Sequence, residues 1–180
     1  MKFIRPAVAA FTLVCAAMPS AIADPAADAA SLRNFRLTPE FLAKWESFDE
    51  AAAQDPCHLL PMPVLAKAQT KQMSLDQMVA AYDAQPGVHA ALAQHGLTAR
   101  EAMMGMMTLM AAATQDLMHA HPEMVQKGEI SMSMTVSKAN MDFYHAHAAE
   151  MRQHQMKVGQ EELKRNHGKL PACFADMGGH

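Results

Sequence analysis

The sequence lacks the short patterns that mark several common protein classes. It contains no HExxH zinc motif, no GxSxG nucleophile elbow, no P-loop lysine pattern and no CxxCH haem-attachment motif. It also has no basic patch, so nucleic acid is not an expected partner. A catalytic site need not show a short motif, so an enzyme stays possible. Since no catalytic residues can be named, a role other than catalysis is the expectation.

Long apolar runs are also missing, apart from one at the start of the chain. Lys2 and Arg5 precede an apolar run over residues 7–18, and small residues lead up to a cleavage site after Ala23. A basic region, a run too short to span a bilayer and a small-x-small site are typical of a signal peptide. We therefore expect residues 1–23 to be removed and the mature chain to be periplasmic or secreted, without stable membrane insertion.

Cysteine is scarce, and two cysteines follow the expected cleavage site. Cys57 and Cys173 could form a disulfide or serve as thiolate metal ligands. We favour the disulfide because oxidising compartments convert pairs of free thiols. It would close a loop of 116 residues and contribute on the order of 4–5 kcal/mol in the chain-entropy account.

Helix signals recur along the chain, whereas strand signals do not. Thr38 with Pro39, the Ser74 and Thr98 capping boxes, and Ser137 all precede stretches with helical spacing of apolar residues. These signals predict an all-α domain over residues 38–180. The expected architecture resembles a four-helix bundle whose second helix is broken near Pro86. Residues 24–37, rich in Ala and Asp, are expected to be loose.

Several of these signals recur together in a group of small exported bacterial proteins. The stretch "PGVHAALAQHGLTAREAMM" followed by "SKAN" resembles that group's P-x-V…AL…GLT-x-RE core and S-x-x-N helix start. The resemblance covers roughly residues 38–156 and implies a helical exported domain. The group has no settled activity, so it implies no catalytic residues. Its matching positions are Pro86, Val88, Ala91, Leu92, Gly96, Leu97, Thr98, Arg100, Glu101, Ser137 and Asn140.

Methionine and histidine are unusually abundant. The expected mature chain keeps 16 Met and all ten His, with 13 basic and 18 acidic residues and a net charge of −5. In the helix predicted from Thr98, many of the methionines fall on one stripe. Met is a good core filler, so core packing is one interpretation, and stacked thioethers that bind a soft metal ion are the other. The candidate ligands on this stripe are Met103, Met107 and Met110.

The last predicted helix begins near Lys138 and carries two ladders of Met and His. His147, Met151 and His154, spaced i, i+4 and i+7, share a face with aromatic residues. Met141, His145 and Met156 lie on a second face. A histidine on an apolar face is more often a buried, hydrogen-bonded residue than a ligand. Three of them interleaved with Met are harder to explain as core, because each imidazole needs polar partners when buried.

A third Met and His cluster follows the predicted helix that begins at Thr98. Met118, His119, His121 and Met124 lie where a helix ends at Pro122, and Met132 and Met134 follow in a connector. Short tracts of this kind can bind metal without a packed site. His119 and His121 are therefore further candidate ligands.

The chemistry of these ligands indicates copper. Thioethers are soft and match Cu(I), and imidazole suits Cu(I), Cu(II), Zn or Ni. The sequence thus predicts an exported copper-binding protein, with His147, Met151 and His154 as first candidates. The alternatives are a bundle that holds haem non-covalently between Met and His, and a metal-free interaction protein whose Met-rich helices contact partners.

Overall fold

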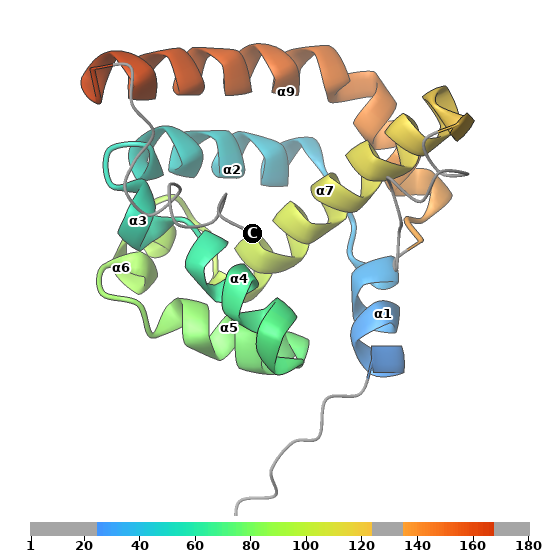
Figure 1. The fold of residues 1–180 in the computed structure, drawn as a ribbon, viewed down its shortest axis with the longest axis horizontal. Helices are drawn as coiled ribbons and strands as arrows, with labels where there is room; N and C mark the ends of the chain where they lie inside the picture. Colours follow the sequence, from blue (N-terminus) through green and yellow to red (C-terminus); the bar gives the residue numbers. More distant parts are fainter. Residues whose placement is uncertain (1–24, 124–134, 168–180) are drawn as a thin grey trace, which may run out of the picture.

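The computed structural model describes residues 25–123 and 135–167, and all its regular elements are helices (Figure 1). The prediction of an all-α protein is therefore confirmed. The described parts contain α1 (Pro25–Asn34), α2 (Pro39–Ala52), α3 (Pro56–Leu59), α4 (Met62–Lys71), α5 (Leu75–Asp83), α6 (Val88–Gln94), α7 (Ala99–Ala120) and α9 (Lys138–Arg165).

The expected bundle of four main helices is not what the described residues form. Long helices α2, α7 and α9 pack with five shorter ones, and α3 to α6 cluster at one end of α7 (Figure 1). Two of the short helices, α3 and α4, begin at prolines. Pro56 stands in the first turn of α3 and Pro63 in that of α4. Proline fits this position because the first N–H groups of a helix have no partner within it.

The predicted helix starts are confirmed by their capping hydrogen bonds. Ser74 and Thr98 each accept a bond from the backbone N–H three residues on, and Gln77 and Glu101 return the bond as capping boxes. Thr38 and Ser137 cap α2 and α9 in the same way. The predicted break near Pro86 is also present, since α5 ends at Asp83 and α6 begins at Val88.

The N-terminal segment differs from the expected loose chain. Residues 25–34 form α1, and Asp28 accepts a 2.8 Å hydrogen bond from the backbone N–H of Leu75 at the start of α5. This bond places a carboxylate at the positive end of the α5 dipole. Leu32 from the same helix is buried in the main core. Alanine favours helix, and these tertiary contacts hold the segment in place.

α2 and α9 lie side by side and run in the same direction (Figure 1). At their N-terminal ends Asn140 joins them, since its Nδ2 donates to the carbonyl of Phe35 at 2.7 Å and its Oδ1 accepts from the N–H of Leu37 at 2.9 Å. Further along, Lys157 forms an ion pair with Glu50, and Arg165 donates to the carbonyl of Ala53. Polar contacts therefore tie α9 to α2 along most of its length.

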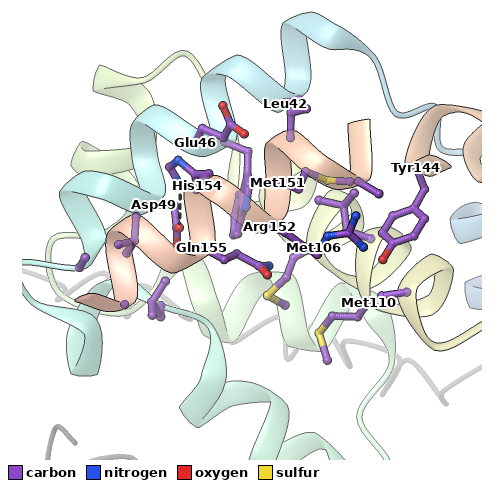
Figure 2. Close-up of a pocket in the computed structure, with 18 of the residues that line it drawn as sticks. Leu42, Glu46, Asp49, Met106, Met110, Tyr144, Met151, Arg152, His154 and Gln155 are labelled. Carbon is purple, nitrogen blue, oxygen red and sulfur yellow. Dashed lines mark hydrogen bonds and ion pairs between the residues drawn. The ribbon is translucent and has the colours of Figure 1, made fainter. Parts of the chain in front are cut away.

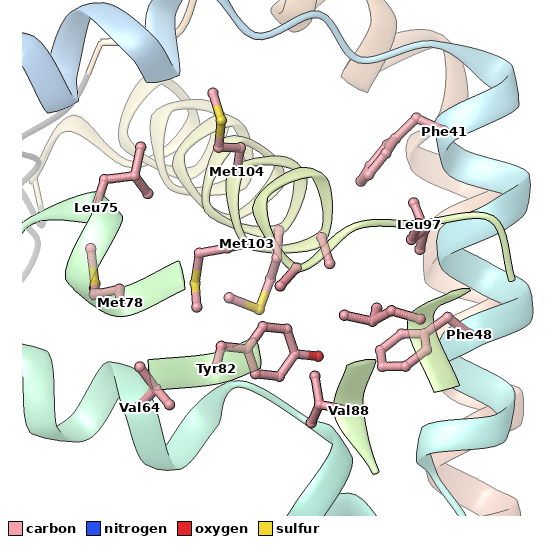
Figure 3. Packing of buried hydrophobic residues seen from close by; sticks show 14 of the residues in the cluster. Phe41, Phe48, Val64, Leu75, Met78, Tyr82, Val88, Leu97, Met103 and Met104 are labelled. Atoms are coloured by element: carbon pink, nitrogen blue, oxygen red, sulfur yellow. The ribbon is translucent and has the colours of Figure 1, made fainter. Parts of the chain in front are cut away.

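The main core lies where α2, α5, α6 and α7 meet (Figure 3). Tyr82, Phe48, Val88 and Met103 are fully buried in it. The Tyr82 hydroxyl donates to the carbonyl of Leu59 at 2.7 Å, and burial raises the pKa of this phenol well above its usual range. This bond satisfies the one polar atom of a buried aromatic side chain.

A glycine in the middle of α7 allows α2 to approach closely. Gly105 lies under the Phe41 ring, and a Cβ at this position would come within 1.8 Å of the Phe41 Cζ atom. The crossing of α2 and α7 therefore depends on the missing side chain.

Some expectations concern residues outside the described part of the chain. The expected signal peptide, residues 1–23, lies there, as does Cys173, so the disulfide stays a prediction. Cys57 is half-buried in α3. None of the helices in the described ranges is both long and apolar enough to cross a membrane.

Candidate metal-binding cavity

A cavity of about 370 Å³ lies between α2, α7 and α9 (Figure 2). Its volume is in the range of small-molecule sites. Apolar side chains from all three helices line it, including Leu42, Leu109 and Val158. Polar side chains enter from α2 and α9, and Leu60 contributes from the segment between α3 and α4.

Sulfur atoms reach this cavity from two helices. Met106 and Met110 of α7 are one turn apart, and Met151 of α9 lies opposite them (Figure 2). Met106 and Met151 are buried, whereas 52% of Met110 is exposed. The cavity thus has three thioethers, one of which borders solvent. Facing helices of a helical domain are a common place for metal ligands.

His154 brings an imidazole to the same cavity. Its Nε2 lies 3.0 Å from Asp49 Oδ2, and 11% of its side chain is exposed. An ionised carboxylate can only accept, so in this bond Nε2 donates its hydrogen to Asp49. The carboxylate nearest to Nδ1 in the described chain is that of Glu50, at 3.9 Å, which is too far for a hydrogen bond. A histidine held by a carboxylate on one nitrogen is the usual arrangement of a metal-ligating imidazole.

Asp49 and Glu50 sit in contrasting electrostatic environments, although they are neighbours. Burial raises the pKa of Asp49 above its ordinary value, and the hydrogen bond from His154 opposes this rise. Lys157, at 2.7 Å, holds the pKa of the exposed Glu50 carboxyl below its usual range. The Asp49 carboxylate is therefore the buried partner of His154, whereas Glu50 belongs to a solvated ion pair.

The structure separates the residues of the predicted ladder of His147, Met151 and His154. Met151 and His154 line the cavity, but His147 lies outside it. The His147 ring stacks on Phe143 with centroids 4.3 Å apart, and its Nδ1 lies 2.9 Å from Glu150 Oε2. Its neighbours Tyr144 and Ala148 line the cavity, so the His147 side chain is directed away from it.

The residues of the second predicted ladder, Met141, His145 and Met156, also lie apart. Met141 is buried in a small cluster with Ala111, Ala112 and Val136, whereas 61% of Met156 is exposed. His145 is exposed and lies 3.0 Å from Asp116 of α7. The structure therefore does not bring Met141, His145 and Met156 together.

The candidates on α7 lie in three different places. Met103 is fully buried in the main core, and Met107 packs against that core from its edge. Met110 alone of the three lines the cavity. His119 and His121 are exposed near the end of α7, where His121 lies 3.1 Å from Glu123. Met124, Met132 and Met134 fall outside the described residues.

Several cavity residues are not among the ligands predicted from the sequence. Met106 follows the helical spacing of the other methionines of α7, but this spacing cannot show that α7 turns Met106 toward α9. Trp45, Glu46 and Glu162 also line the cavity. No sequence signal marks these three, since a half-buried Trp and two Glu on amphipathic helices are typical of core edges and surfaces.

No group of three or more His, Cys, Asp and Glu side chains within residues 25–123 and 135–167 is placed to hold a metal ion. Methionine is not part of that ligand set. The comparisons add no relative, because no protein family, curated protein or solved structure matches this chain. The candidate site therefore stands on its own geometry and chemistry.

Proposed function

We propose that this is an exported copper-binding protein that holds Cu(I) in the cavity between α2, α7 and α9. The ligands are the thioethers of Met106, Met110 and Met151. The observation that carries the proposal is that these three side chains, from two facing helices, line one cavity. Thioethers are soft ligands, which match Cu(I) better than Zn²⁺, Ca²⁺ or Mg²⁺.

Partial exposure of the site fits a protein that buffers or hands over copper. Met110 borders solvent, so an ion can enter and leave past its thioether. A thioether needs no deprotonation to bind, and so the sulfur ligands keep working at mildly acidic pH, where imidazole ligands weaken. Export and a Cys57–Cys173 disulfide belong to this proposal. The disulfide would leave the thioethers as the soft ligands in an oxidising compartment.

The experiment is an anaerobic competition titration of the purified protein with Cu(I). Trp45 is the only tryptophan in the chain and lines the cavity, so its fluorescence reports on binding. We expect Met110→Leu to weaken Cu(I) binding by about tenfold or more, which corresponds to about 1.4 kcal/mol of binding free energy. The fold should survive, because Leu is similar in volume and Met110 is half-exposed.

Met156→Leu is the matched control, since Met156 is exposed on α9 and does not line the cavity. It should leave the Cu(I) affinity unchanged. Equal effects of the two substitutions would place the site elsewhere. An affinity no better than that of a mixture of free Met and His peptides would contradict copper binding altogether. A Soret band in the purified protein would favour haem instead.

A further inference from the structure

The three thioethers of the proposed copper site differ in how far they are open to solvent. Met106 of α7 and Met151 of α9 are each 9% exposed, whereas 52% of Met110 is exposed. All three line the same cavity, and Figure 2 shows Met106 and Met110 along one helix with Met151 on the other. An oxidant dissolved in water can therefore reach Met110 directly, whereas the side chains packed around Met106 and Met151 shield those two.

The chemistry of a thioether makes this difference in exposure important. Hydrogen peroxide transfers one oxygen atom to the sulfur of methionine: an S–O bond forms and the O–O bond breaks. The hydrogen on the transferred oxygen moves to the departing hydroxide, which leaves as water. The sulfur loses two electrons, and the peroxide gains them. The product, methionine sulfoxide, is polar and presents a hard oxygen where a soft thioether had been.

The position of Met110 is also one at which the fold can tolerate this product. Water can hydrate the sulfoxide oxygen of a half-exposed side chain, so little hydration is lost. Met106, in contrast, belongs to the main core, where a new polar oxygen would lose its water without gaining a partner. Oxidation at Met110 therefore changes the ligands of the cavity and leaves the core intact.

A second exposed methionine separates the effect of exposure from the effect of the cavity. Met156 of α9 is 61% exposed and does not line the cavity. The same oxidant should reach it as easily, but its oxidation removes no ligand from the proposed site. Met110 differs from Met156 because it combines exposure with a place in the cavity.

We propose that Met110 is an oxidation site through which peroxide controls the copper affinity of the cavity. Conversion of its thioether to the sulfoxide leaves Met106 and Met151 as the sulfur ligands and weakens Cu(I) binding. Methionine sulfoxide reductases restore the thioether, so the change is reversible. The effect on copper rests on the proposed function, whereas the oxidation of Met110 does not.

The first experiment locates the oxidation. The folded, copper-free protein is treated with hydrogen peroxide in the presence of a metal chelator, and mass spectrometry of its peptides assigns the added oxygen to individual residues. We expect Met110 and Met156 to be oxidised at a peroxide dose that leaves Met106 and Met151 unmodified. Oxidation of Met106 or Met151 to the same extent as Met110 would overturn the proposal.

The second experiment measures the consequence for copper. After removal of the peroxide, the oxidised protein is titrated anaerobically with Cu(I) in competition with a chelator. We expect its affinity to be about tenfold lower than that of the untreated protein, and reduction by methionine sulfoxide reductases to restore it. An unchanged affinity in protein that carries oxidised Met110 would overturn the proposal.

Two leucine variants identify the methionine that is responsible, since leucine is not oxidised by peroxide. Met156→Leu should lose Cu(I) affinity on peroxide treatment to the same extent as the wild type. Met110→Leu begins with a lower affinity and should show no further loss. A further loss in Met110→Leu as large as that of the wild type would assign the effect to another methionine and contradict the proposal.

These measurements distinguish failure of this proposal from failure of the proposed function. Absence of Cu(I) binding in the untreated protein would contradict the copper site, and the control of its affinity with it. The peptide analysis would still show whether Met110 is oxidised before Met106 and Met151. Cu(I) binding that peroxide leaves unchanged would contradict only the role of oxidation and would leave the copper site standing.

Discussion

His154 and Asp49 are joined by a 3.0 Å hydrogen bond between Nε2 and Oδ2, although 105 residues separate them in the chain. The bond connects α9 to α2 at the side of the cavity. The other ring nitrogen, Nδ1, faces Glu50 Oε1 at 3.9 Å. His154 therefore serves as a link between the two helices.

The pH dependence of stability offers a prediction about Asp49. Burial raises the pKa of this group in the folded protein above 3.8, the value for an unperturbed Asp. Its contribution to stability is therefore fully present below pH 3.8 and is lost as the pH rises through the folded-state pKa. We expect the free energy of unfolding of the wild type, relative to Asp49→Asn, to increase as the pH is lowered toward 3.8.

Denaturant unfolding of both proteins across this pH range measures the difference. Exposed carboxylates such as Glu40, whose pKa is lowered by Lys44, act alike in the two proteins and cancel. The difference in the free energy of unfolding between the two proteins could instead stay constant with pH or change in the opposite direction. Either result would show that burial does not dominate the pKa of Asp49.

The Asn140 side chain should be important for stability. It is 1% exposed and satisfies both the carbonyl of Phe35 and the N–H of Leu37 between α1 and α2. Asn140→Ala leaves these two groups without their partner and should cost about 2–3 kcal/mol in the free energy of unfolding. Asn34→Ala, at an exposed position in α1, should stay within about 0.5 kcal/mol of the wild type. Comparable losses would contradict the bridging role.

Two helical glycines give opposite predictions for the same substitution. Gly105→Ala places a Cβ inside the Phe41 ring and should destabilise the protein by about 3 kcal/mol. Gly159→Ala meets no atom within 4 Å and should stabilise α9 by up to about 1 kcal/mol. Thermal unfolding of both variants checks this. Similar effects at the two positions would contradict the close crossing of α2 and α7.

The local parts of this fold were predictable from the sequence. The caps at Thr38, Ser74, Thr98 and Ser137 depend on hydrogen bonds between residues three apart, so their spacing predicts them. α1 was not predicted because its position depends on contacts such as Asp28 with Leu75, which are distant in sequence. α3 and α4 were missed because proline can start a helix as well as end one.

The candidate site was predictable only in part for a related reason. Spacing along one helix places His147, Met151 and His154 on a common face, but it cannot show which of these side chains will border a cavity formed with two other helices. Met151 and His154 meet the cavity, and His147 does not. Which methionines of α7 accompany them depends on how α7 faces α9, and spacing within α7 does not determine that.

The most direct test of the copper site is NMR of the protein labelled at the methionine methyl carbons, recorded anaerobically with and without Cu(I). Each methyl group is bonded to the sulfur atom that would bind the metal. The account predicts that the signals of Met106, Met110 and Met151 shift together, whereas those of the buried Met103 and Met141 stay in place. Shifts confined to other methionines, or no shift at any of these three, would contradict a copper site between α2, α7 and α9.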